Sequence, residues 1–553
     1  MMDRKWIKKC RAVSGLWLVL YLSIGSALAS SWQDEPAARQ QLHQLGLELA
    51  LADVHPRLTE WWQQAVATES ASDAADDRLL LGLQSFWRYW ATLSFNDRQY
   101  LRTQKADLSL VAADQDNLRL AGQLKRRWQL VQGLTPNFAN YLQLQQQLTY
   151  LIEQRDFAWP GLRTATVRPG ERLAVVEPIR ERLRLLGDMP KLMEVDTALV
   201  PDVDTVPELD IELDSTGVPE GVALSEEAFS ASNATSASVS SLLRGNIGNA
   251  AVNSTSLTSE FSDPQLYDAK LEEGVRRFQQ RHGLTVDGVI GPQTYAWLDT
   301  SPLTRAQLLM RSMMRTLISD ELSSSYLLVN IPEYHMRLYQ NQVMVLESNV
   351  IVGRDTRKTP VMANKITNVV FNPPWNVPRS ILNKDIVPKL YRDPGYIERQ
   401  GFEVLDGEGV VPRFIWQRRL EEGGGFPYRL RQRPGRGSAL GAYKFHLPNS
   451  DAIYLHDTPS RGLFGRDSRD LSSGCVRVEG AEQLANWLLQ DQLGSSRLAA
   501  LKTSGKTRWI KVAKPLPLFM VYWSGWLGAD GVPHYRNDIY KFDRGLKNPF
   551  AAG

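Results

Sequence analysis

A histidine and a cysteine in residues 454–478 have the types and the setting of a catalytic pair. Cys475 is the second of two cysteines in the 553-residue chain, and His456 precedes it at the end of an apolar, strand-like run. A cysteine attacks as the thiolate, and a nearby imidazole brings thiol ionisation within reach of neutral pH. The pair predicts a nucleophile, Cys475, with His456 as general base and acid. His446 is the nearest alternative base, and an inert buried thiol is the alternative for Cys475.

The residues around Cys475 supply the other groups that an acyl transfer needs. Ser472, Ser473 and Gly474 form a flexible turn before it, and the backbone amides of such a turn can hold the oxyanion of a tetrahedral intermediate. Arg477 follows two residues later, so in an extended chain it shares a face with Cys475 and could hold a substrate carboxylate. This chemistry requires no metal and no cofactor.

The cysteine count and the charge exclude several other classes of protein. Two cysteines cannot build a disulfide framework or a cysteine-based zinc cluster, and a net charge of +3 argues against a dedicated nucleic-acid-binding protein. Residues 1–29 combine a basic segment, an apolar run and an Ala-x-Ala sequence, which predicts a signal peptide. An uncleaved membrane anchor is the alternative. In either case the bulk of the protein is expected outside the cytoplasm.

The catalytic pair falls within residues 324–512, which we interpret as a mainly β domain. Short runs rich in Val, Ile, Leu and Tyr alternate there with polar or Gly/Pro breaks. The predicted strands are 326–331, 335–339, 343–352, 366–371, 442–447, 452–456 and 508–512, with a helix at 481–490. Residues 513–553 contain two further predicted strands, 519–523 and 532–536, which we expect to pack on this domain.

A long insertion, residues 379–436, separates the first strands from Cys475 and is rich in glycine and proline. Insertions of this length in a compact domain are typically lids or binding loops. Trp375, Trp416, Phe426 and Tyr428 are candidates to line a site beneath it, and packing within the lid is the alternative for each.

The chain before this domain divides into three parts. Residues 30–166 have apolar side chains at helical spacing and predict a helical scaffold. Residues 167–300 predict a small three-helix module, interrupted at 188–263 by an acidic, serine-rich insertion that cannot bury enough apolar surface to fold. Residues 301–323 predict a linker helix.

The second half of the three-helix module carries a recognisable spacing. Residues 267–298 contain FQxxxGLxxDGxxG and resemble the peptidoglycan-binding domain of bacterial cell-wall enzymes. The resemblance implies that glycan strands of peptidoglycan are a partner. A helical scaffold that has the fold but binds no glycan is the alternative.

The segment around Cys475 resembles the L,D-transpeptidase, or YkuD-type, catalytic domain. The signature of that family is a histidine on a strand followed by Ser-His-Gly-Cys-(Ile/Val)-Arg. The matching residues are His456, Gly474, Cys475 and Arg477. Ser473 stands where most members have a second histidine, which puts the oxyanion site in doubt rather than the reaction.

The resemblance extends to the large, lid-bearing periplasmic subgroup of this family. Tyr454 lies in the matching run 454–458 and Trp375 in the run 372–378, and the resemblance implies that both lie in the substrate site. The implied fold class is multidomain α+β: an all-α scaffold, a peptidoglycan-binding module and a mainly β catalytic domain with an inserted lid. The implied location is the periplasm.

The activity implied by the resemblance is formation of 3→3 cross-links between diaminopimelate residues of peptidoglycan stem peptides. A cysteine thioester would form and D-alanine would leave. The alternatives are attachment of a lipoprotein to peptidoglycan, peptide hydrolysis, and a non-enzymatic wall-binding scaffold. A cysteine hydrolase usually places its cysteine before its histidine, the reverse of the order of His456 and Cys475. Cell-wall synthases or activator proteins are left open as partners.

Overall fold

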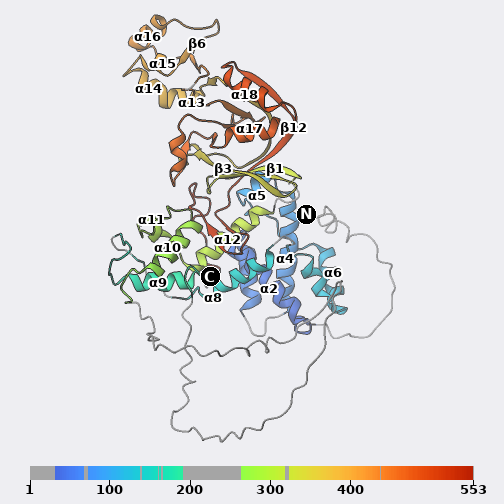
Figure 1. Cartoon of the computed structure of the whole chain (residues 1–553). Helices are drawn as coiled ribbons and strands as arrows, with labels where there is room; N and C mark the ends of the chain where they lie inside the picture. Colours follow the sequence, from blue (N-terminus) through green and yellow to red (C-terminus); the bar gives the residue numbers. More distant parts are fainter. Residues whose placement is uncertain are drawn as a thin grey trace, which may run out of the picture.

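The computed structural model describes residues 31–67, 73–136, 140–157, 159, 161–162, 166–190, 263–317, 323–435 and 437–551 (Figure 1). The predicted signal peptide, and residues 191–262 of the predicted insertion, lie outside the described residues. Within the described ranges, no helix combines the length and the apolar character that crossing a bilayer requires. Helices make up the first half of the described chain and strands dominate the second, so the predicted multidomain α+β class is confirmed.

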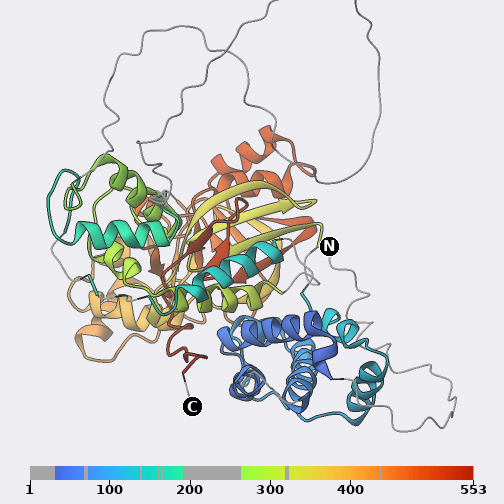
Figure 2. The same cartoon turned by 90° about the horizontal axis from the view of Figure 1, so that it is seen from below.

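The N-terminal part is helical: Figure 2 shows the helices before residue 133 gathered in blue, and helix 141–153 in teal. They are α2 (Pro36–Leu51), α3 (Pro56–Val66), α4 (Asp73–Thr92), α5 (Phe95–Gln99), α6 (Ala112–Gln123), α7 (Arg127–Gln132) and α8 (Tyr141–Glu153), after a 3-10 turn at Trp32–Asp34. The apolar residues that recur every three or four positions in α4, such as Leu79 and Phe86, are fully buried. Gly82 lets α4 approach α3 closely, because a Cβ there would lie 2.4 Å from the Trp61 ring.

The next three helices form a second small core. They are α9 (Val176–Leu185), α10 (Ala269–Arg281) and α11 (Pro292–Leu298). Ile179 of α9 and Phe278 of α10 are fully buried in a shared cluster, so the two pieces on either side of residues 191–262 pack together. Asp188, which the sequence places in the insertion, instead forms a buried ion pair with Arg281 at 2.5 Å. The module therefore extends past the end of α9.

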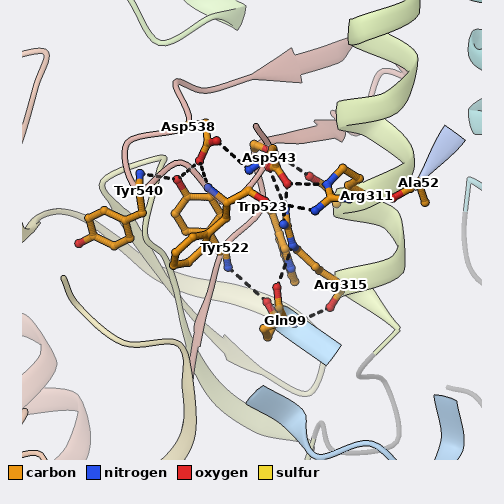
Figure 3. A network of polar contacts seen from close by, with 12 residues as sticks. Ala52, Gln99, Arg311, Arg315, Tyr522, Trp523, Asp538, Tyr540 and Asp543 are labelled. Atoms are coloured by element: carbon orange, nitrogen blue, oxygen red, sulfur yellow. Dashed lines mark hydrogen bonds and ion pairs between the residues drawn. The ribbon is translucent and has the colours of Figure 1, made fainter. Parts of the chain in front are cut away.

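Helix α12 (Pro302–Thr316) connects the helical parts to the C-terminal segment through buried charges (Figure 3). The guanidinium groups of Arg311 and Arg315 donate to the carboxylate of Asp543 at 2.6–3.0 Å. Arg315 also donates to the backbone carbonyl of Gln99 in α5, 2.9 Å away. These contacts join three segments that are far apart in the sequence.

The strands near the predicted catalytic pair belong to one sheet whose pairings close on themselves. Its order is β10-β3-β11-β9-β8-β4-β12-β1-β2, and β2 also pairs with β3. The strands are β1 (Ser325–Asn330), β2 (His335–Gln340), β3 (Val343–Gly353), β4 (Met362–Phe371), β8 (Tyr443–His446), β9 (Leu455–His456), β10 (Asp470–Ser472), β11 (Val476–Val478) and β12 (Arg508–Val521). Apolar side chains from these strands pack with those of α17 (Ala481–Leu489) and α18 (Ser495–Thr503) in one core.

Strand β12 corrects the prediction of two separate strands after residue 507. It runs unbroken from Arg508 to Val521 and lies inside the sheet, between β4 and β1. Its pairing with β4 shifts register between Lys511 and Leu516. Pro515 lies in this interval, and a proline cannot donate to a strand ladder, which explains why the sequence suggests a break.

The last two strands form a separate hairpin, β13 (Gly525–Leu527) and β14 (Pro533–Tyr535). Tyr535 is fully buried and belongs to the same apolar core as the helices, and its ring stacks 5.5 Å from that of His282. This hairpin therefore packs against the helical module rather than finishing the core of the catalytic sheet.

The predicted lid, residues 379–436, folds around a small core of its own at the top of Figure 1. Its elements are α13 (Arg379–Ile381), a π-helical turn (Leu382–Ile386), α14 (Val387–Leu390), α15 (Tyr396–Arg399), β6 (Phe402–Leu405), α16 (Arg413–Glu421) and β7 (Arg429–Gln432). Strands β7 and β6 form a three-stranded sheet with β5 (Trp375–Asn376), which precedes the lid.

Candidate active site

Two parallel strands bring the predicted catalytic residues to one face of the sheet. Leu455 of β9 pairs with Val476 of β11, and both side chains are fully buried in the core. Because side chains alternate along a strand, the next pair, His456 and Arg477, projects from the opposite face. Cys475 immediately precedes β11 and shares that face.

His456 is held as a neutral imidazole. Its ring is buried, and Nδ1 donates to the backbone carbonyl of Asp457 at 2.6 Å, which leaves Nε2 as the basic nitrogen. Burial and the charge of Arg477 lower the pKa of His456 to about 3. The group that orients the imidazole is thus the backbone carbonyl of Asp457. The carboxylate of the same residue instead accepts from Arg461 at 2.6 Å.

Cys475 is half-buried and is present as the thiol in this arrangement. Its Sγ donates to the carbonyl oxygen of Ala452, 3.7 Å away. Burial raises the pKa of this thiol, whereas hydrogen bonds from the backbone and the hydroxyl of Tyr454 act in the opposite direction. Hydrogen bonds between catalytic groups often tighten only when substrate binds. The structure therefore corresponds to the resting site, before the thiol of Cys475 loses its proton.

The turn before Cys475 depends on one glycine and one threonine. Gly474 has a φ of +115°, a region that favours glycine, and its amide donates to the Ser472 hydroxyl at 3.1 Å. The Gly474 carbonyl accepts from the hydroxyl of Thr359 at 2.8 Å. The amide of Gly474 is therefore occupied, whereas that of Cys475 has no hydrogen-bond partner in the part of the chain that the structure describes. The Cys475 amide is the stronger candidate for an oxyanion donor.

Ser473 points to the lid rather than into the oxyanion site. Its hydroxyl accepts from Arg354 at 3.1 Å and from Arg357 at 3.0 Å. Arg357 also forms a two-pronged ion pair with Asp385, which lies in the π-helical turn of the lid. The residue at the position of the family's second histidine thus takes part in a contact between the nucleophile turn and the lid.

Tyr454 lies beside Cys475, and Trp375 lies beside Tyr454. The indole of Trp375 donates to the Tyr454 hydroxyl, which in turn contacts Cys475. Of the other aromatic candidates, Trp416 and Phe426 are buried in the core of the lid and Tyr428 packs against that core. Trp416 and Phe426 thus follow the alternative of packing within the lid, and Tyr428 contacts the same core.

Two further residues, Thr359 and Lys444, lie beside the site, although no role is predicted for either from the sequence. Thr359 reaches it from the segment before β4, and its hydroxyl also accepts from the amide of Gly353 at 2.8 Å. Lys444, on β8, places its Nζ 3.9 Å from the centroid of the Tyr454 ring. The register of the sheet is what places Lys444 beside His456. His446, the alternative base, packs instead against Trp509, with ring centroids 5.4 Å apart.

Comparisons with known proteins identify two segments. Residues 324–507 match the family model of the L,D-transpeptidase catalytic domain (YkuD), and residues 259–298 match a "Putative peptidoglycan binding domain". A curated protein of Haemophilus influenzae named "Putative L,D-transpeptidase" is 46% identical over 219 residues, which are 39% of this chain and 44% of that protein. The chain thus matches less than half the length of this relative.

Two solved structures share a weaker likeness. The Ldtfm-avibactam carbamoyl enzyme is 13% identical over 36% of this chain and 49% of its own, with a TM-score of 0.18. The L,D-transpeptidase from Xylanimonas cellulosilytica is 14% identical over 46% of this chain and 82% of its own, with a TM-score of 0.17.

Proposed function

We propose that this chain, which carries an L,D-transpeptidase catalytic domain in residues 324–507 and a peptidoglycan-binding domain before it, forms 3→3 cross-links between peptidoglycan stem peptides. The observation that carries the proposal is the arrangement of Cys475, His456 and Arg477 on one face of two paired strands. A nucleophile, a neutral base and a cation for a carboxylate are the groups that this acyl transfer needs.

The reaction would proceed through a thioester on Cys475. His456 Nε2 takes the thiol proton as Sγ attacks the carbonyl carbon of the third residue of a tetrapeptide stem. The amide of Cys475 donates to the resulting oxyanion. Collapse breaks the peptide bond, and D-alanine leaves with the proton that His456 had taken.

The second half of the reaction repeats these steps with an amine in place of the thiol. The side-chain amine of the diamino acid in a second stem attacks the thioester carbonyl and loses its proton to His456. The C–S bond breaks, the thiol of Cys475 is restored, and a 3→3 peptide bond remains. No redox partner is needed, since every bond that forms is matched by one that breaks.

The match to a peptidoglycan-binding domain is a second, independent reason to propose peptidoglycan as the substrate. A module that binds glycan strands would keep the catalytic domain close to its stem peptides. Export by residues 1–29, and action in the periplasm, follow from this proposal. Synthases or activator proteins that direct the enzyme would be further partners.

The acceptor distinguishes the proposed activity from its alternatives. Full-length protein without its signal should convert disaccharide-tetrapeptide into a cross-linked dimer with release of D-alanine, measured by chromatography and mass spectrometry. Cys475→Ala should abolish the dimer, whereas Ser504→Ala, on the surface after α18, should not. Tripeptide without dimer would overturn the proposal in favour of a hydrolase. Transfer only to a protein lysine would indicate lipoprotein attachment.

A further inference from the structure

Lys444 is a charged residue of the site to which the reaction above assigns no role. It lies on β8, where its Cα pairs with that of His456, and His456 pairs in turn with Arg477. Its neighbours Tyr443 and Phe445 are buried in the core. Lys444, His456 and Arg477 therefore form one row across three strands, on the face that also carries Cys475.

The ammonium group of Lys444 lies over the Tyr454 ring, which adjoins Cys475. Its Nζ lies 3.9 Å from the centroid of the Tyr454 ring, and the backbone and hydroxyl of Tyr454 both donate to Cys475. The titratable and charged groups that face Lys444 and Cys475 from β8, β9 and β11 are His446, His456, Tyr454 and Arg477.

Among the described residues no carboxylate pairs with Lys444, although it is half-buried. Two other lysines do have such partners: Lys502 pairs with Glu482 at 2.8 Å, and Lys541 of the C-terminal segment pairs with Asp355 at 2.8 Å. The nearest acid in sequence to His456, Asp457, pairs with Arg461.

A half-buried ammonium without a counter-ion is costly unless an anion forms beside it. The anion that this reaction creates is the thiolate of Cys475. Burial lowers the pKa of Lys444, and the charges of Lys444 and Arg477 act against the burial that raises the pKa of Cys475. Since the resting imidazole is neutral, it contributes no positive charge beside the sulfur until it takes the thiol proton.

We propose that Lys444 is the counter-ion of the Cys475 thiolate, a positioning residue held over the Tyr454 ring so that its charge stabilises the sulfur anion when the thiol loses its proton. The proton goes to His456 in the enzymatic reaction and to water in a simple alkylation, and the charge left on sulfur faces Lys444. The proposal deepens the proposed function and rests on it only for the identity of the nucleophile.

The test is the pH dependence of Cys475 alkylation by iodoacetamide in the full chain without substrate. Lys444→Met keeps the apolar stem over Tyr454 but removes the charge, so we expect the midpoint of the rate profile to rise by roughly one pH unit. Lys444→Arg, which keeps the charge, should return the midpoint towards that of the parent. Lys511→Met, an exposed lysine on β12, is the matched control for net charge and should leave the midpoint unchanged.

A midpoint that stays unchanged in Lys444→Met would overturn the proposal and leave Lys444 a packing partner of Tyr454. An equal rise in Lys444→Arg would overturn it too, since it would show that shape and not charge matters. Melting temperatures identify any variant that fails to fold, and Lys444→Gln then serves as the neutral form. Because alkylation needs no peptidoglycan, an unchanged midpoint with normal cross-linking rejects only this role, whereas normal alkylation without cross-linking rejects the proposed function.

Discussion

At the scale of single residues, the protonation states of the catalytic pair define how the site works. His456 is neutral because it is buried and faces Arg477, and Cys475 is a thiol because burial opposes its ionisation. The resting pair is therefore thiol and imidazole rather than thiolate and imidazolium. Attack on a substrate must include the proton transfer, which Lys444 and Tyr454 are placed to assist.

This arrangement predicts an unusual acid limb in the pH profile of kcat/KM. A base whose pKa is lowered to about 3 is neutral at all higher pH values, so the rate should not decline between pH 7 and pH 5 through protonation of His456. The measurement is kcat/KM for cross-linking from pH 4 to pH 9 at constant ionic strength. A decline with a midpoint close to 6.5, the ordinary histidine value, would contradict the assignment.

The sequence identifies the residues near the nucleophile better than those that reach it from elsewhere. Cys475, His456 and Arg477 share one local signature, and the structure brings them together. The place of Lys444 depends on which strands become neighbours, and no short pattern encodes that. The sequence could not show whether an aromatic residue of the lid, such as Trp416, lines the substrate site or packs in the lid core. Aromatic side chains are common in both environments.

At the scale of elements, the lid and the nucleophile turn are connected by one polar cluster. Arg357 binds both Asp385 of the lid and the hydroxyl of Ser473, two residues before Cys475. Arg357, Asp385 and Ser473 are far apart in the sequence, so no local pattern predicts their contact. Within this cluster the Ser473 hydroxyl accepts from Arg357, the residue that also pairs with the lid.

Loss of the lid contact should weaken substrate binding more than it affects the thiol. In Asp385→Asn the ion pair with Arg357 is lost, so we expect KM for the tetrapeptide to rise several-fold while the iodoacetamide rate at Cys475 is unchanged. Asp393→Asn is the control, because that acid pairs with Arg399 within the lid. Equal effects of the two substitutions on KM would show that the contact with the turn has no special role.

The strands show where local patterns mislead. Pro515 and Pro517 suggest a break, yet β12 continues through them and pairs with β1 on one side and β4 on the other. The register shift covers Pro515, whereas Pro517 lies beyond it and pairs with Lys365. Strand β9 is shorter than predicted, because only Leu455 and His456 join the ladder. Hydrophobic runs thus locate most strands, while tertiary pairing sets their ends.

At the scale of the whole molecule, Asp543 joins the helical parts to the catalytic domain (Figure 3). Burial acts to raise the pKa of this carboxyl, but Arg315 and Arg311 lower it well below its usual value. Such a carboxylate contributes stability that is complete above the unfolded pKa, close to 4, and is lost as the pH falls towards the folded pKa. No sequence pattern predicts this contact, since its partners lie more than 200 residues apart.

Asp543→Asn should strongly destabilise the protein at neutral pH. It leaves two buried guanidinium groups without their counter-ion, a change that typically costs about 3 to 5 kcal/mol. Thermal unfolding at pH 7 should show this loss, and the difference from the parent should shrink as the pH is lowered below 4. Asp491→Asn, at an exposed acid, should have little effect; an equally small effect of Asp543→Asn would contradict the assigned role.

The central claim is that Cys475 accepts the acyl group of a stem peptide, and intact-protein mass spectrometry tests it most directly. Full-length protein incubated briefly with disaccharide-tetrapeptide, and separately with a carbapenem, should gain one adduct in each case. We predict that peptide mapping places both adducts on Cys475, that the stem adduct lacks D-alanine, and that hydroxylamine removes it as it would a thioester. Adducts that map to residues other than Cys475, or undiminished conversion by Cys475→Ala, would contradict the account.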